Sequence, residues 1–363
     1  AWLITGPPGS GRSNAAKAFA AALQCVDHGC GQCNACRTTL SGAHPDVTLV
    51  RTEALSIGVD EVRELVRRAA MNPVHGCHQV VVVEDADRIT ERGADALLKA
   101  IEEPAPKTVW LLCAPTPEDV IVTIRSRCRR LHLATPRDEA VADLLTRRDG
   151  IAPEVAAEAA RAGQGHIGRA RRLAWDEEAR ARRNAIGELP TRLRSLGDCL
   201  QAAEDLVNQA SEEAAAATAE VNAAERAELK KALGFGSSGA RPRNAQAALR
   251  DLEKQQSARL KRLQRDALDR VLTELTAYHR DVLAIQTGAV RPEEENALRG
   301  ARLVNAGWSA SLHRIADSQS PEHTVATIDA ILAARKSLEH GVTPLLVMET
   351  LLIAMTGVDR ARW

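Results

Sequence analysis

The chain has 363 residues, of which 45% are hydrophobic and 26% are charged, and its 48 basic residues balance its 48 acidic residues. This length and apolar content predict a folded protein of two or three domains. The balanced charge excludes binding of nucleic acid through a global basic field, and an aromatic content of 2% argues against a single-strand binder that stacks bases. No apolar run approaches the ~18 residues that a membrane span needs, so we expect no membrane partner and a cytoplasmic location.

Short apolar runs alternate with helical stretches over residues 1–134, a pattern typical of a parallel sheet covered by helices. The chain opens at Ala1 directly in an apolar run, and we therefore expect the natural N-terminus to be absent. The strands predicted are residues 1–5, 47–50, 79–84, 109–114 and 129–133. The helices predicted between them are residues 13–23, 60–70, 91–103 and 117–125.

Beyond Pro136 the strand pattern stops, and the remaining chain is predicted to be helical. A small helical lid is predicted from helices over residues 138–148, 153–162 and 167–175. Longer helices follow, interrupted by a Gly/Ser/Pro-rich stretch at 234–244 that predicts a mobile loop in an exposed helical hairpin around 210–250. The fold class is thus α/β followed by all-α, with domains at 1–134, 135–178 and 179–363.

A glycine-rich turn, GPPGSGRS, stands between the first apolar run and the first helix. Backbone N–H groups of such a turn, together with the positive end of the helix, hold phosphates. Arg12 occupies the position at which a lysine normally reaches the terminal phosphates, and the two side chains are not interchangeable. The stretch predicts a degenerate P-loop in which Ser13 would supply the hydroxyl for magnesium; the alternative is a turn kept only for folding. Its residues are Gly6, Pro7, Pro8, Gly9, Ser10, Gly11, Arg12 and Ser13.

A second apolar strand ends in Glu84 and Asp85, which resemble a Walker B pair with the two acids exchanged. In the usual order an aspartate serves the metal ion and a glutamate polarises the attacking water. Asp85 is one methylene shorter than glutamate, so that placing the water within hydrogen-bond reach is harder. The pattern predicts a site that can still bind ATP and Mg²⁺ but does not hydrolyse the nucleotide.

Four cysteines, Cys25, Cys30, Cys33 and Cys36, follow the spacing C-x4-C-x2-C-x2-C within a module at residues 25–36. Four thiolates at this spacing in a reducing compartment favour a structural Zn²⁺ site over disulfides. Free or oxidised cysteines are one alternative, and a DNA-binding zinc finger is another, although the module lacks a recognition helix. The other cysteines, which we expect to be small core residues, are Cys77, Cys113, Cys128 and Cys199.

Two further stretches, residues 57–106 and 116–128, are similar to the clamp-loader branch of the AAA+ ATPases, in particular to bacterial DNA polymerase III subunits. The second stretch ends in the signature Ser126-Arg127-Cys128. In that family the arginine is a finger that enters the ATP site of the neighbouring subunit and stabilises charge on the transferring phosphoryl group. The resemblance therefore implies a catalytic role in trans for Arg127; charge patterning alone also allows a solvated arginine in a basic run.

Within this family the chain resembles the delta-prime branch, whose members lack ATPase activity, more than the tau/gamma motor branch. Arg12, the exchanged acids and the Ala114-Pro115 pair, where motors carry a polar phosphate sensor, favour this assignment. The place of a second sensor arginine falls on residue 168 or 169. Residues 343–355 are similar to the last collar helix of the family, which implies that the C-terminal domain is a collar. The retained P-loop and the helical hairpin depart from the delta-prime pattern.

The resemblance implies a non-motor subunit that joins tau/gamma motor subunits and a delta subunit in a hetero-oligomeric ring. Such a subunit lends Arg127 to a neighbour, has no ATPase activity of its own or a weak one, and helps to place the sliding clamp on primed DNA within a DNA polymerase III holoenzyme. Two alternatives remain. The chain could be an active ATPase of the tau/gamma type, or a zinc-dependent nucleic-acid-binding regulator, which would bind DNA alone with a steep salt dependence.

Overall fold

The computed structural model describes residues 1–52, 56–233, 245–290 and 303–356. They divide into two compact units, Ala1–Trp175 and Asp176–Trp363. The first unit contains the predicted α/β region together with the three helices predicted as a lid, and the second unit is helical. The predicted mobile loop at 234–244 lies outside the described residues.

Five parallel strands form one sheet in the order β2-β3-β4-β1-β5. The strands are β1 (Trp2–Thr5), β2 (Val47–Val50), β3 (Gln79–Val83), β4 (Thr108–Ala114) and β5 (Arg129–His132). Each predicted strand is present within one residue of its expected bounds. Every residue of β3 is buried, as expected for a parallel strand whose two faces are both covered. The predicted α/β fold is confirmed.

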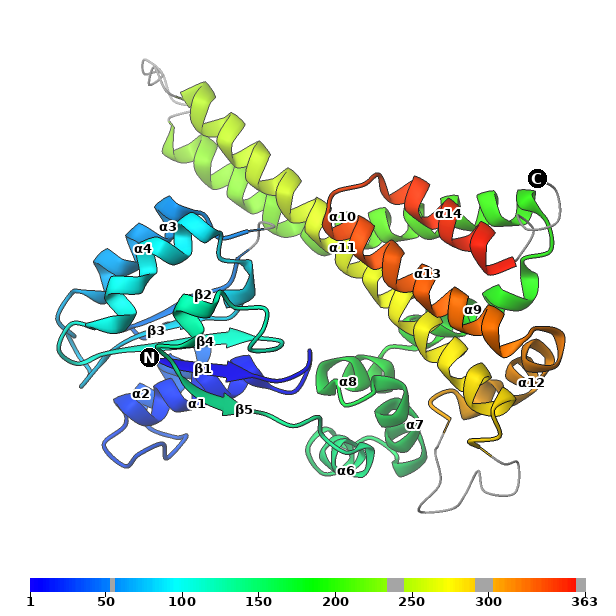
Figure 1. Ribbon diagram of the computed structural model, residues 1–363. Coiled ribbons are helices and arrows are strands. Elements are labelled where there is room, and N and C mark those ends of the chain that lie inside the picture. Colours follow the sequence, from blue (N-terminus) through cyan, green and yellow to red (C-terminus); the bar gives the residue numbers. More distant parts are fainter. Residues whose placement is uncertain (53–55, 234–244, 291–302, 357–363) are drawn as a thin grey trace. The chain divides into compact units, whose positions relative to one another are not determined.

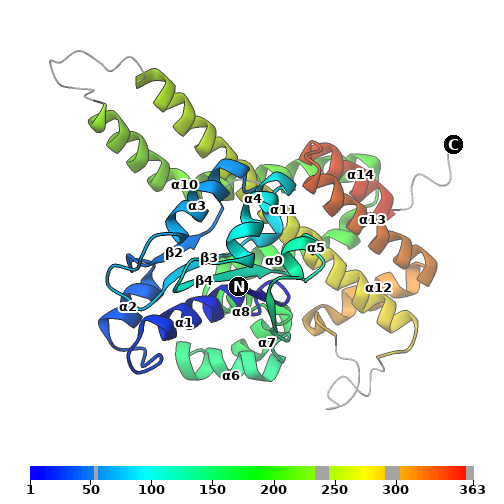
Figure 2. The same cartoon turned by 60° about the vertical axis from the view of Figure 1, so that its left-hand side comes forward.

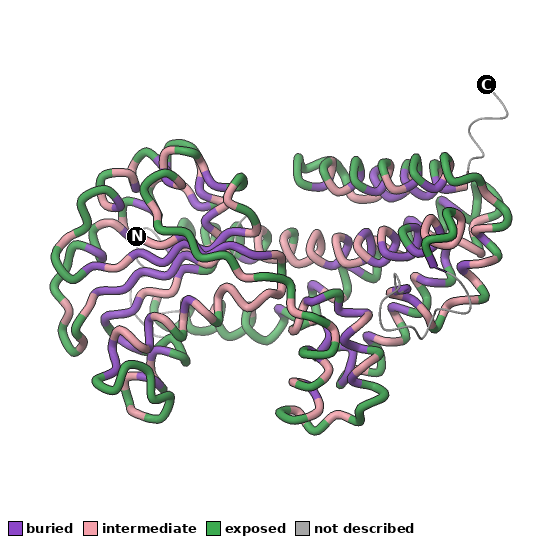
Figure 3. Tube along the Cα trace, turned by 60° about the horizontal axis from the view of Figure 1, so that its bottom comes forward, coloured by how far each residue is buried: buried purple, intermediate pink, exposed green. Residues whose placement is uncertain are grey.

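Helices cover both faces of this sheet (Figures 1 and 2). On one face α1 (Arg12–Gln24) packs on the strands, and on the other face α3 (Val59–Ala69) and α4 (Glu91–Glu102) do so. Successive strand residues point to opposite faces, so each strand feeds two cores. The α1 face buries Ile4, Val80, Val82, Leu111, Ala16 and Ala20. The α3 and α4 face buries Leu3, Val81, Val83, Leu112, Val62, Leu65 and Leu97. Figure 3 shows the central strands as buried.

Two helices of the first unit differ from the prediction. The structure adds α2 (Asn34–Ser41), an eight-residue helix that begins at the end of the cysteine module and that the sequence pattern did not predict. The helix predicted at 117–125 is reduced to α5 (Val122–Arg125). Its first residues instead form a turn, in which the Asp119 carboxylate accepts a hydrogen bond from the Thr116 amide at 2.9 Å. Such side-chain capping of a turn competes with helix formation.

The three helices that end the first unit agree with the pattern: α6 (Asp138–Asp149), α7 (Pro153–Gly163) and α8 (Ile167–Trp175). Pro153 begins α7, where its missing N–H costs nothing. Gly150, with a φ of 69°, ends α6 in the left-handed conformation that favours glycine. The helices α7 and α8 bury alanines against one another, so this small bundle is closely packed.

The second unit consists of helices that pack around one main core. They are α9 (Glu177–Arg192), α10 (Leu196–Ala232), α11 (Ala245–Gln286), α12 (Ser309–Ser318), α13 (Pro321–Glu339) and α14 (Pro344–Thr356). The core lies between α10, α11, α13 and α14 and includes Leu268, Leu272, Ile331, Met348 and Leu352. Beyond this core α10 and α11 continue side by side as a two-helix arm (Figures 1 and 2). Among the described residues no helix is both long enough and apolar enough to cross a membrane.

Candidate functional site

The order of the strands brings the predicted nucleotide-site residues to one edge of the sheet. The strands β3, β4 and β1 are neighbours. The glycine-rich turn follows β1, the two acids follow β3, and Ala114-Pro115 closes β4. The Gly6 amide donates a hydrogen bond to the Pro115 carbonyl at 3.1 Å, which ties the turn to the end of β4. The carboxyl edge of a parallel sheet is the usual place for a ligand site.

The glycine-rich turn contacts the start of α8. The helix α1 begins at Arg12, and its N-cap, Gly11, provides no side-chain cap, so its first amides point out of the helix uncapped. Gly9 has a φ of 81°, and a methyl group on it would lie 2.1 Å from the His166 Cγ. Only glycine fits there, because His166 at the start of α8 lies directly on the turn. The Ser10 hydroxyl is buried and has no hydrogen-bond partner in the described part of the chain.

Arg12 uses its guanidinium within the turn. Its Nη1 donates a hydrogen bond to the carbonyl of Gly6, at the start of the same turn. Burial lowers the pKa of His166, and the nearby charges of Arg169 and Arg12 lower it further, so this imidazole is neutral near pH 7. Because of its hydrogen bond to Gly6, the arginine at the position of the usual lysine is bound to the backbone of its own turn.

Glu84, the first of the two acids that follow β3, also has an internal partner. The Lys17 ammonium lies 2.9 Å from a Glu84 carboxylate oxygen, and the side chains are 27% and 12% exposed. Lys17 stands one helical turn after Ser13, on the same side of α1. The sequence analysis did not single out Lys17; a basic residue four positions after the P-loop serine was the available signal.

The Arg12–Gly6 and Lys17–Glu84 contacts can be compared with what Mg²⁺-ATP requires of its site. A hydrolytic site needs a cation that reaches the terminal phosphates and acids that serve the metal ion and the attacking water. Here Arg12 is bound to Gly6 and Glu84 is neutralised by Lys17. Two of the charged residues at this edge, Arg12 and Glu84, thus have partners within the chain.

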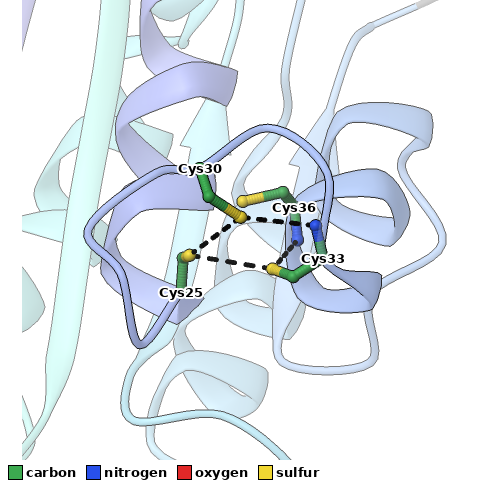
Figure 4. A group of neighbouring side chains, drawn as sticks. All are labelled: Cys25, Cys30, Cys33 and Cys36. Atoms are coloured by element: carbon green, nitrogen blue, oxygen red, sulfur yellow. Dashed lines mark hydrogen bonds between the residues drawn. The ribbon is translucent and has the colours of Figure 1, made fainter.

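The four predicted metal ligands lie together (Figure 4). Their sulfur atoms are all within 4.8 Å of one another, and Cys25 Sγ lies 3.7 Å from both Cys30 Sγ and Cys33 Sγ. Tetrahedral zinc with Zn–S bonds near 2.3 Å places its sulfurs about 3.8 Å apart. Cys33 is the N-cap of α2, and its sulfur accepts a hydrogen bond from the Cys36 amide. The cluster can bind a metal ion such as zinc.

The environments of two of these thiols differ. Backbone hydrogen bonds, the largest from Cys30, lower the pKa of Cys25 to about 6. Burial raises the pKa of Cys36 to about 12, and Cys36 is fully buried. Because zinc binds thiolates, a bound ion would compensate the charge that Cys36 cannot carry alone. Cys113, Cys128 and Cys199 are buried or half-buried as expected, whereas Cys77 is exposed, so the prediction of a core position was wrong for Cys77.

Arg127 lies in the three-residue link between α5 and β5. Its Nε lies 3.0 Å from a carboxylate oxygen of Glu102, at the end of α4, and the Arg127 side chain is 35% exposed. Its Nη1 donates to the Thr123 carbonyl at 2.9 Å. The guanidinium is thus held at the surface by two elements of the first unit.

The neighbouring arginines have other partners. Arg125 lies 3.4 Å from Glu118, and the guanidinium of Arg129 lies over the Trp2 ring, 5.6 Å from its centroid. Arg127 is therefore not one of several equivalent charges in a solvated run. The sequence analysis did not identify Glu102, which is 25 positions away in the chain.

The parallel sheet with a glycine-rich turn at its carboxyl edge, the four-cysteine module and the helices that follow the sheet form a clamp-loader-like fold. Residues 1–137 match the family model described as "DNA polymerase III, delta subunit". The chain is 36% identical over 153 residues to DNA polymerase III subunit delta' of Haemophilus influenzae. The aligned region covers 41% of this chain and 47% of that protein. The first part of the chain is therefore similar to DNA polymerase III delta-prime subunits.

Other relatives match the same part of the chain. Subunit delta' of Escherichia coli is 33% identical over 188 residues, which covers 50% of this chain and 56% of that protein. Subunit gamma/tau of Mycobacterium tuberculosis is 35% identical over 144 residues, which covers 38% of this chain and 25% of that protein. The chain spans about half the length of the curated delta-prime relatives that it matches.

Proposed function

We propose that this chain is a non-motor subunit of a DNA polymerase III clamp loader. It lends Arg127 to the ATP site of a neighbouring tau/gamma motor subunit, and with a delta subunit in the same ring it helps to place the sliding clamp on primed DNA. The observation that carries this proposal is the contrast between two arginines. Arg12 is bound to the backbone of its own turn, whereas Arg127 is fixed at the surface.

Arg127 would act on a nucleotide held by the neighbour. A guanidinium has a planar fork of N–H donors that matches phosphate oxygens, and it keeps its charge at any physiological pH. Placed against the transferring phosphoryl group, it stabilises the charge that develops there. This chain's own site supplies no hydrolysis, because Lys17 neutralises Glu84.

The remaining parts of the chain take supporting roles in this proposal. Cys25, Cys30, Cys33 and Cys36 bind a structural Zn²⁺, with all four coordination positions filled by protein. The region 1–134 is the AAA+ domain, 135–178 is its lid, and 179–363 is the collar that meets other subunits. The two-helix arm within 210–250 is an insertion on the collar.

Replacement of Arg127 by alanine tests the proposal. In a loader reconstituted with motor and delta subunits, Arg127→Ala should lower DNA-stimulated ATP hydrolysis at the site that this chain serves by about 10³-fold, the lower end for an arginine finger. Arg125→Ala is the matched control and should leave the rate unchanged, because Arg125 pairs with Glu118 within this chain. A normal rate with Arg127→Ala, in a loader whose assembly is unchanged, would refute the finger assignment.

A further inference from the structure

Glu102 occupies a position that helix stability does not explain. It is the last residue of α4, and a carboxylate there faces the negative end of the helix dipole, which is unfavourable. The preceding residue, Ile101, is buried in the core on the α3 and α4 face. The backbone that carries Glu102 is therefore fixed, and the Arg127 guanidinium at 3.0 Å offsets the unfavourable charge.

The contacts of Arg127 hold two of the three nitrogens of its guanidinium. Nε faces Glu102, and Nη1 donates to the Thr123 carbonyl, on α4 and α5 respectively. Within the described residues Nη2 donates no hydrogen bond. The two contacts fix the plane of the group, and the Nη2 edge remains available to a ligand outside this chain.

We infer that Glu102 is a positioning residue for the arginine finger. This inference rests on the proposed function and adds to it a second residue, which touches neither nucleotide nor motor subunit. A free arginine side chain populates many rotamers, and ordering it at each encounter slows catalysis. Glu102 and the Thr123 carbonyl order Arg127 before the neighbouring subunit binds ATP.

The size of the effect follows from the exposure of the pair. The two side chains are 35% and 55% exposed, and exposed ion pairs contribute about 0–1 kcal/mol. Loss of the pair should therefore lower the rate about three- to fivefold, far less than loss of Arg127. Because the finger acts on the transition state, kcat should fall while KM for ATP is unchanged.

The experiment compares variants at two adjacent glutamates in the reconstituted loader. Glu102→Ala should lower kcat for ATP about three- to fivefold, and Glu102→Gln, which keeps an acceptor oxygen at the same reach from the guanidinium, should restore part of the rate. Glu103→Ala is the matched control, because Glu103 is the exposed next residue outside this contact. In an Arg127→Ala loader, Glu102→Ala should have no further effect.

Each other outcome overturns the inference. An unchanged or raised kcat with Glu102→Ala would mean that Glu102 does not position the finger. An equal loss in the Arg127→Ala background, or a fall in the thermal stability of Glu102→Ala and Glu102→Gln alike, would make Glu102 a structural residue. A loss of rate with Arg127→Ala but not with Glu102→Ala overturns only this inference, whereas no loss with Arg127→Ala overturns the proposed function as well.

Discussion

At the scale of single residues, two charged side chains at the predicted nucleotide site have partners within the chain. Arginine in place of lysine at position 12 reaches back to the Gly6 carbonyl, and Glu84 has Lys17 as its partner. The four cysteines, in contrast to these charged pairs, lie within 12 residues of sequence, and their sulfur atoms lie close together. A metal site built from adjacent residues depends little on the rest of the fold, which is why its spacing alone predicted it.

Replacing one ligand tests the metal site. Cys33→Ser should lower the zinc content from one ion per chain to well below one after dialysis, because serine is a poor ligand for this ion and three thiolates leave the site open. It should also lower the thermal stability of the first unit, since metal binding adds to folding free energy. Metal analysis by mass spectrometry gives the content.

Cys77→Ser is the control for this experiment, because Cys77 is an exposed cysteine outside the cluster. Its zinc content should equal that of the unchanged chain. A full complement of zinc in Cys33→Ser would contradict a four-thiolate site.

At the scale of elements, buried side chains hold one loop through hydrogen bonds that the local sequence pattern does not predict. The Asp46 carboxylate, at the start of β2, accepts hydrogen bonds from the amides of residues 74–76 at 2.6 to 2.7 Å. The Gln24 side chain, at the end of α1, accepts from the Cys77 amide and donates to the His78 carbonyl. Together they tie the loop before β3 to the region of the cysteine module.

Asp46→Asn should lower the free energy of unfolding of the first unit by about 2–3 kcal/mol. The asparagine side chain is neutral, and its NH₂ group replaces one of the two carboxylate oxygens that accept hydrogen bonds. Burial raises the pKa of Asp46, but the three amides outweigh burial and hold the pKa below its usual value. The stabilisation is therefore present above the unfolded value of about 3.9 and is lost as pH falls through the lower native value. Thermal unfolding from pH 5 downwards measures both effects.

The exposed Asp60, whose side chain is 93% exposed, provides the control variant Asp60→Asn. It should leave both the stability and its acid dependence nearly unchanged. An Asp46→Asn chain with the same acid dependence as the unchanged chain would refute a charged role for Asp46.

The elements themselves could largely be predicted from the sequence, because strands and helices follow local periodicity. The five strands agree within one residue, and the lid helices agree closely. The turn at 116–120 and the helix α2 were missed, because side-chain caps at Asp119 and Cys33 decide them. The Lys17–Glu84 and Arg127–Glu102 pairs were missed as well, since each joins residues that only the fold brings together.

At the scale of the whole molecule, the alternation of strands and helices places the glycine-rich turn and the two acids after the carboxyl ends of their strands and the Arg127 link before the start of β5. The meeting of the turn and the acids could be predicted, because parallel strands align their carboxyl ends. The helical second unit could be predicted only as a series of helices. Its Arg183–Glu274 pair, for example, joins buried side chains of α9 and α11 that lie 91 positions apart.

The central claim is that this chain assists hydrolysis elsewhere while its own nucleotide site does none. Steady-state ATP turnover by the isolated chain tests this claim most directly. We predict no turnover above background, and no change in that result with Asp85→Asn. Turnover at a rate typical of ATPases, abolished by Asp85→Asn, would contradict the account.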